Sequence, residues 1–155
     1  MTTDLRIVRA GLGDVDLVVP LFDLYRQFYA QPPDPAAARR FIGERISAGD
    51  SAIFVAMRGF GPRAAVAGFT QLYPTFSSVS MSAIWTLNDL FVAEESRRAG
   101  IARRLLEHAA AFGKESGATR LVLLTAHDNT PARALYEKLG WELDTKFSRY
   151  TLRLT

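Results

Sequence analysis

A short basic turn, Arg97-Arg98-Ala99-Gly100, constrains the fold more than any other part of this chain. It follows a strand-like apolar run and precedes residues 101–117, which carry apolar side chains at helical spacing and end at a glycine. Residues 120–125 come next and are almost all apolar, as in a central strand. A strand, a helix and a strand in this order predict two parallel strands joined by a crossover. Open α/β sheets bind ligands at the carboxyl ends of such strands, which is where the turn falls.

The turn itself has the chemistry of an anion site. The first N–H groups of a helix have no partner within the helix, and the helix dipole places partial positive charge there. Arg97 and Arg98 add full charges and bidentate donors, and the small Gly100 and Ala102 leave room beside the backbone. The turn lacks the Gly-Lys-Ser/Thr ending of a P-loop and the glycines of a Rossmann turn. The sequence therefore favours a phosphorylated cofactor here, with a solvated basic turn as the alternative.

Composition narrows the class of protein. A chain of 155 residues fits one domain, 1–155, with a core of its own. The net charge of +3 favours anionic ligands but is too small to indicate nucleic acid. The absence of cysteine excludes disulfides, thiolate metal sites and a cysteine nucleophile, and no metal site is predicted. Without a signal-peptide pattern or a membrane-length apolar run, we expect a cytoplasmic protein.

The other elements alternate along the chain, which predicts an α/β fold. Asp34 and Pro35 have the pattern of a cap and first residue of a helix, and Thr130 and Pro131 repeat it near the C-terminus. We expect further strands at 5–8, 53–57, 64–73 and 79–92, helices at 14–29, 35–48 and 130–139, and a closing antiparallel pair at 141–143 and 147–154.

The apolar pattern of the run 79–92 changes phase near its end. Apolar residues alternate up to Leu87, but the next one is Leu90, three positions later. A β-bulge near Asn88-Asp89 is the simplest cause, and bulges tend to lie beside active sites. The alternative is a strand buried on both faces, where alternation carries little information.

Three motifs in the second half of the chain resemble those of the GNAT family of N-acetyltransferases. They are Leu87-Asn88-Asp89-Leu90-Phe91-Val92, Arg97-x-x-Gly100-x-Ala102, and Asn129-x-x-Ala132-x-x-Leu135-Tyr136-x-x-Leu139-Gly140-Trp141. The resemblance is specific over residues 85–141, while the N-terminal half is similar in element order only. Many members have Gln where this chain has Arg97, and Gly where it has Ala102. The resemblance implies a mixed, mostly antiparallel central sheet with a parallel pair at the cofactor site, flanked by about four helices.

The same resemblance implies acetyl-CoA as co-substrate and assigns residues to it. The backbone of the bulged strand would pair with the pantetheine arm, the turn would hold the pyrophosphate, and the last helix would contact the thiol end of the cofactor. The residues so assigned are Leu90, Phe91, Val92, Arg97, Arg98, Ala99, Gly100, Ile101, Ala102, Asn129 and Ala132. For Asn129, stabilisation of the helix start is an equally good explanation.

Acetyl transfer from a thioester to a primary amine sets three chemical requirements. The amine must lose a proton, the developing oxyanion needs a donor, and the leaving thiolate needs a proton. Tyr136 is the expected acid, since a phenol with a pKa of about 10 can protonate a thiolate with a pKa of about 8.5. Asp89 is the candidate base. The alternatives are a core aromatic for Tyr136 and an ion pair for Asp89. Without a cysteine, direct attack by the amine is favoured over a cysteinyl intermediate.

The sequence says little about the acceptor. Tyr25, Phe28, Tyr29 and Tyr73 are candidates for an acceptor pocket, although each also fits plain packing. A small amine, an amino acid, a polyamine and a protein lysine or N-terminus all stay open. Membership of such a family also suggests a homodimer. A non-catalytic acyl-CoA-binding module is the competing function, and a nucleic-acid-binding module is disfavoured by the modest charge.

Overall fold

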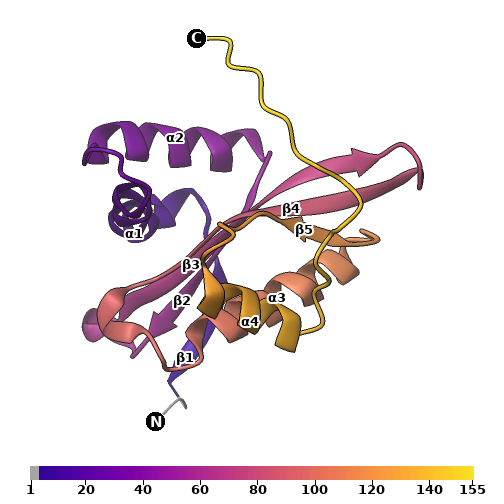
Figure 1. Cartoon of the computed structure of the whole chain (residues 1–155). Helices are drawn as coiled ribbons and strands as arrows, with labels where there is room; N and C mark the ends of the chain where they lie inside the picture. Colours follow the sequence, from indigo (N-terminus) through magenta and orange to yellow (C-terminus); the bar gives the residue numbers. More distant parts are fainter. Residues whose placement is uncertain (1–3) are drawn as a thin grey trace. The chain divides into compact units, whose positions relative to one another are not determined.

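The computed structural model describes residues 4–155 and divides into two compact units, one ending at Leu124 and one spanning Thr125–Thr155 (Figure 1). The first unit contains a five-stranded sheet in the order β1-β2-β3-β4-β5. Neighbouring strands are antiparallel except for β4 and β5, which are parallel. The strands are β1 (Leu5–Arg9), β2 (Ala52–Arg58), β3 (Ala65–Ser77), β4 (Ser82–Val92) and β5 (Leu121–Leu123). The mixed α/β sheet with a parallel pair at β4 and β5 is therefore confirmed.

Three helices pack on the two faces of this sheet. The helices α1 (Val15–Phe28) and α2 (Pro35–Ala48) cover one face, and α3 (Ile101–Glu115) covers the other (Figure 1). Successive side chains of β2 point to opposite faces of the sheet, so this strand contributes to the packing on both faces. Ile53, Val55 and Met57 belong to the core under α1 and α2. Phe54 instead contacts the rings of His108 and Phe112 on α3. Short 3₁₀ turns occur at Leu12–Asp14, Gly61–Arg63 and Glu94–Ser96.

Local signals set the ends of α2 and of β4. The carboxylate of Asp34 accepts a hydrogen bond from Ala37 N at 3.0 Å, with Pro35 first in the helix, as the sequence predicts. The strand expected from residue 79 begins instead at Ser82. The residues before it form a turn in which Met81 N donates to Ser78 O and Met81 has a φ of 49°. The β3–β4 hairpin therefore reverses through residues that its apolar pattern had assigned to a strand.

The second unit contains α4 (Thr130–Lys138) and no strand among its described residues. The cap of α4 is Asn129, whose side chain accepts from Ala132 N at 3.4 Å, and not the expected Thr130. The closing antiparallel pair expected at 141–143 and 147–154 is also wrong for this structure. Asp144 Oδ1 instead accepts from the backbone N–H groups of Lys146 and Phe147, and such a local turn competes with a ladder. Among the described residues, no helix has the length and apolar character needed to span a membrane.

Candidate functional site

The change of phase in β4 is a β-bulge at Asn88. Gln71 of β3 pairs with Asp89, whereas the next residue, Leu72, pairs with Leu87, so that Asn88 is the extra residue. The bulge expected near Asn88-Asp89 is thus confirmed. The carbonyl oxygen of Asn88 accepts a hydrogen bond from the hydroxyl of Tyr25 at 3.2 Å. Helix α1 is therefore joined to β4 at the point where the strand changes phase.

The bulge leaves Asp89 buried, with only 3% of its surface exposed. One carboxylate oxygen accepts from Gln71 Nε2 at 2.6 Å and the other from Asn88 Nδ2 at 2.9 Å. Burial raises the pKa of Asp89 above its ordinary value, while these hydrogen bonds and one from Tyr25 act in the opposite direction. A buried carboxylate with a raised pKa is a suitable proton acceptor, because its pKa lies closer to neutral pH than that of an exposed aspartate.

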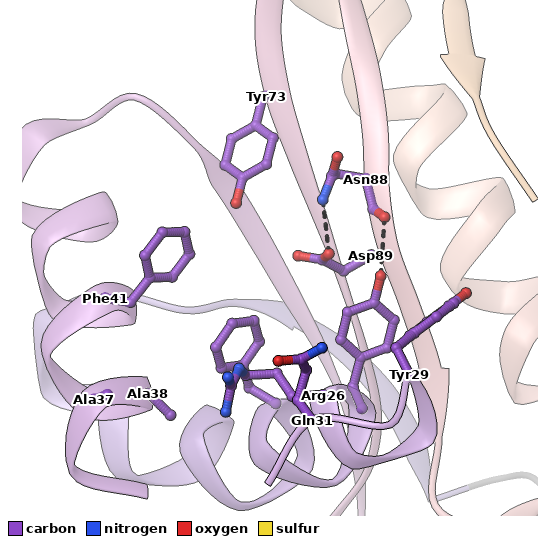
Figure 2. A pocket seen from close by; sticks show the side chains of 11 residues that line it. Arg26, Tyr29, Gln31, Ala37, Ala38, Phe41, Tyr73, Asn88 and Asp89 are labelled. Carbon is purple, nitrogen blue, oxygen red and sulfur yellow. Dashed lines mark hydrogen bonds between the residues drawn. The ribbon is translucent and has the colours of Figure 1, made fainter. Parts of the chain in front are cut away.

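Asp89 lies at the wall of a cavity of about 560 Å³, which has α1 and α2 on one side and strands β3 and β4 on the other (Figure 2). This volume is in the range of small-molecule sites. The walls are aromatic and apolar, with a few polar groups among them. The lining residues are Phe22, Tyr25, Arg26, Tyr29, Gln31, Ala37, Ala38, Phe41, Tyr73, Asn88 and Asp89.

Two tyrosines of this cavity are affected by the buried carboxylate. Burial raises the pKa of Tyr25 and Tyr73 well above the ordinary value, and the negative charge of Asp89 raises it further. Both phenols are therefore neutral at physiological pH and keep their hydroxyl protons. Figure 2 shows the hydroxyl of Tyr73 directed into the space beside Asp89, opposite the ring of Phe41.

The structure sorts the aromatic residues that the sequence singled out for an acceptor pocket. Tyr25, Tyr29 and Tyr73 line the cavity, but Phe28 does not. Phe28 is 62% exposed and packs against the rings of Tyr29 and Phe91. Sequence reasoning missed the remaining lining residues, Phe22, Arg26, Gln31, Ala37, Ala38, Phe41 and Asn88. Helical spacing does place Phe22 and Arg26 on the same side of α1 as Tyr25 and Tyr29, which was an available signal.

The basic turn has backbone geometry that suits an anion. Arg98 has a φ of 64° and Gly100 a φ of 75°, and no side chain among the described residues caps the start of α3. Turns with left-handed residues gather successive N–H groups into anion-binding concavities, here at the positive end of a helix. Arg97 Nε donates to Val92 O at 3.0 Å, and its guanidinium lies 5.4 Å from the ring centroid of Phe91. The arginine thus fastens the turn to the end of β4.

One edge of β4 lacks a strand partner beyond the bulge. The parallel ladder between β4 and β5 pairs residues 85–87 with 121–123 and ends at Leu87 and Leu123. Leu90, Phe91 and Val92 pair with β3 on their other side. Within the described part of the first unit, the β5-facing edge of this segment is therefore free to pair with an extended ligand.

The remaining predicted residues lie on α4 in the second unit. Asn129 caps this helix through Ala132 N, which accounts for it as a structural residue. Tyr136 is partly buried and its ring centroid lies 6.0 Å from that of Trp141. Their roles toward a cofactor and in proton transfer stay predictions.

Comparison with known proteins agrees with this geometry. The acetyltransferase (GNAT) family model matches residues 18–141. A Bacillus subtilis protein described as the uncharacterized N-acetyltransferase YhfO is 43% identical, with 97% of this chain and 98% of the relative covered. A probable acetyltransferase of Haemophilus influenzae is 27% identical over 97% of this chain and 99% of its own length. The crystal structure of a probable acetyltransferase superposes with a TM-score of 0.90 at 41% identity, covering 97% of this chain and 98% of that one.

Proposed function

Because the chain belongs to the acetyltransferase (GNAT) family and is an acetyltransferase enzyme, we propose that it transfers the acetyl group of acetyl-CoA directly to a primary amine. The observation that carries this proposal is the arrangement of β4. One end of the strand leads into the anion-binding turn, one edge is unpaired, and its bulge presents the buried Asp89 to a cavity of small-molecule size.

The residues present fit coenzyme A. The turn from Arg97 to Ala102 offers the uncapped N–H groups of α3 and two exposed guanidinium groups for a pyrophosphate. The free edge of Leu90, Phe91 and Val92 fits the amide groups of a pantetheine arm, which pair as a strand would. A Cβ added at Gly100 would meet no atom within 4 Å, so the backbone there is open to a ligand.

Bound acetyl-CoA would supply an acetyl group activated as a thioester. Asp89 accepts one proton from the incoming ammonium, which frees the nitrogen lone pair for attack on the acetyl carbon. Attack would form the C–N bond and leave negative charge on the acetyl oxygen, which a backbone N–H at the bulge would stabilise. The C–S bond would then break as the second nitrogen proton leaves for solvent, and Tyr136 would protonate the departing thiolate and regain its own proton from solvent. The enzyme forms no acetyl-cysteine, because the chain contains no cysteine.

Binding of the cofactor can be tested with a matched pair of substitutions at the two ends of α3. Gly100→Glu adds bulk and negative charge at the pyrophosphate seat and should abolish the thermal stabilisation by coenzyme A. Gly117→Glu is the control, because Gly117 has a comparable φ of 84° and equally open surroundings at the other end of the helix. If coenzyme A raises the melting temperature of both variants equally, the turn is not its seat. If millimolar coenzyme A fails to stabilise the wild-type protein, the cofactor proposal is wrong.

Catalysis can be followed through the thiol of released coenzyme A. The protein contributes no thiol of its own, so a thiol-reactive dye reports product without background. The expected result is amine-dependent thiol release with acetyl-CoA. Binding of coenzyme A without thiol release for any amine class would instead support the non-catalytic module.

We further propose that the chain acts as a single domain over residues 1–155 and as a cytoplasmic homodimer. Sedimentation analysis tests the dimer.

A further inference from the structure

Resting on the proposed function, we propose that Gln71 is a positioning residue that orients the Asp89 carboxylate and keeps it in the ionised form that accepts a proton. Gln71 belongs to β3 and is the cross-strand partner of Asp89 in the β3–β4 ladder. Its Nε2 donates to Asp89 Oδ2 at 2.6 Å. Gln71 does not line the cavity, so its effect on an amine in the cavity has to pass through Asp89.

The contact between these two side chains is shielded from water. Gln71 has 0% of its surface exposed and Asp89 has 3%. A hydrogen bond to an ionised acceptor is short and strong, and a buried one is strengthened further by the low local dielectric. Because solvent does not reach the amide of Gln71, no water molecule can take over its bond when the side chain is replaced.

The other end of the same amide shows that Gln71 does not serve stability alone. Gln71 Oε1 is buried and has no hydrogen-bond partner among the described residues. A buried acceptor without a partner destabilises the folded state, and an apolar side chain of similar length, such as methionine, would avoid that loss. The bond to Asp89 is therefore the contact that accounts for an amide at this position.

The second amide at Asp89 is less well shielded. Asn88 Nδ2 donates to Asp89 Oδ1 at 2.9 Å, but Asn88 is exposed and lines the cavity. Water in the cavity can replace this donor if it is lost. The buried Gln71 has no such substitute. Burial raises the pKa of Asp89, and the bond from Gln71 is the largest of the contacts that lower it.

The groups around Asp89 leave its charge available to an incoming ammonium. No salt bridge among the described residues includes Asp89. The titratable groups that face it are Tyr25 of α1 and Tyr73 of β3, and both are neutral phenols at physiological pH. An arginine or lysine in place of Gln71 would also favour the ionised carboxylate, but it would repel the cationic acceptor. A neutral amide donor favours the ionised form without that repulsion.

Replacement of the glutamine tests its role through the pH profile of kcat/KM for one amine. Gln71→Met removes the donor and keeps the length of the side chain. The acidic limb of the profile should move about one to two pH units higher, because loss of a hydrogen bond to a charged group raises the pKa of Asp89. Below this limb the variant should be about 10- to 100-fold slower, and most of the loss should be recovered at higher pH. Gln71→Leu should give the same shift and guards against a folding defect in one variant.

Thr70 provides a matched control on the same strand. Its side chain is also 0% exposed, and its Oγ1 donates to the backbone carbonyl of Asp89 at 2.8 Å. Thr70→Val therefore removes a buried hydrogen bond to the same residue without touching the carboxylate. It should lower the melting temperature but leave the acidic limb in place. An unchanged limb in Gln71→Met, or an equal shift in Thr70→Val, would overturn the assignment of Gln71.

A measurement without turnover separates this inference from the proposed function. Carbon-13 NMR titration follows the carboxyl group of Asp89, whose signal is identified by its absence in Asp89→Asn. Its midpoint should lie about one to two pH units higher in Gln71→Met than in wild type. If the midpoint moves but no amine is acetylated, Gln71 still controls the ionisation of Asp89 and the proposed function fails. If amines are acetylated and the midpoint does not move, the proposed function stands and the role of Gln71 is wrong.

Discussion

Replacement of Gly68, a glycine of strand β3, should lower the stability of the protein more than replacement of a glycine with open surroundings. It lies in β3 opposite Val92, and a Cβ added there would come within 2.9 Å of Phe91 O and within 3.3 Å of side-chain atoms of Ile101 and Leu105. The first contact is with backbone, which cannot rotate away. Overpacking of this kind costs about 1–3 kcal/mol, and the reduced freedom of the unfolded chain offsets about 0.4–1 kcal/mol of it. The net loss for Gly68→Ala is therefore about 1.5 kcal/mol.

Two other glycines provide matched comparisons. Gly43, within α2, has no atom within 4 Å of an added Cβ, so Gly43→Ala should stabilise the protein by about 0.5–1 kcal/mol through helix propensity. Gly113 of α3 would place its Cβ 2.7 Å from Leu121 Cδ1, the end of a side chain that can move. The stability of Gly113→Ala should therefore lie between those of Gly68→Ala and Gly43→Ala. One substitution type thus gives three different effects, each decided by the surroundings in the structure.

Thermal and urea unfolding measure these differences. At about 2–4 °C per kcal/mol for a chain of this size, Gly68→Ala should melt about 3–6 °C lower than wild type and Gly43→Ala slightly higher. Because Phe91 belongs to the edge proposed to pair with pantetheine, Gly68→Ala should also weaken coenzyme A binding, while Gly43→Ala should not. A Gly68→Ala protein as stable as Gly43→Ala would refute the packing argument.

Three further substitutions address the site. Asp89→Asn should lower turnover because it removes the proposed base. Because the pKa of Asp89 is raised in the folded state, the folded protein binds this proton more tightly than the unfolded chain, and stability falls as the pH rises from the ordinary aspartate pKa through the raised one. The neutral amide of Asp89→Asn avoids this loss, so the variant should be more stable than wild type at neutral pH. The buried Gln71 Oε1, which has no hydrogen-bond partner among the described residues, can accept from the new amide, and melting curves across pH check the sign. Tyr136→Phe should lower kcat about 100-fold with little change in coenzyme A affinity, and an unchanged kcat would remove the acid role. Asn129→Ala should cost about 1 kcal/mol through loss of the α4 cap. If Asn129 also contacts the cofactor, titration will show weaker coenzyme A binding as well.

Several features of this protein could be predicted because their causes lie close together along the chain. The change of phase between Leu87 and Leu90 identified the bulge, and the Asp34-Pro35 pair identified the start of α2. The basic turn and the helix after it were equally visible, since turn residues and helix starts depend on a few neighbouring positions. Two errors in the expected strands also have local causes, since short turns formed there. A strand was expected from residue 79 and a closing pair at 141–143 and 147–154, but turn hydrogen bonds from Met81 N to Ser78 O and from Lys146 N and Phe147 N to Asp144 Oδ1 are found instead.

The cavity depended on contacts that no local pattern contains. Tyr25 and Asn88 are 63 positions apart, and their hydrogen bond exists only because α1 packs on the sheet beside the bulge. Helical spacing places Phe22 on the same side of α1 as Tyr25, but it could not say which residues that side meets. The buried state of Asp89 and the raised pKa that follows from it likewise come from neighbours on β3 and α1. The sequence by itself determined the bulge, the basic turn and the parallel pairing of the strands on either side of α3, whereas tertiary packing alone decided which charged side chains share the cavity, because burial and charge proximity arise only between segments distant in the chain.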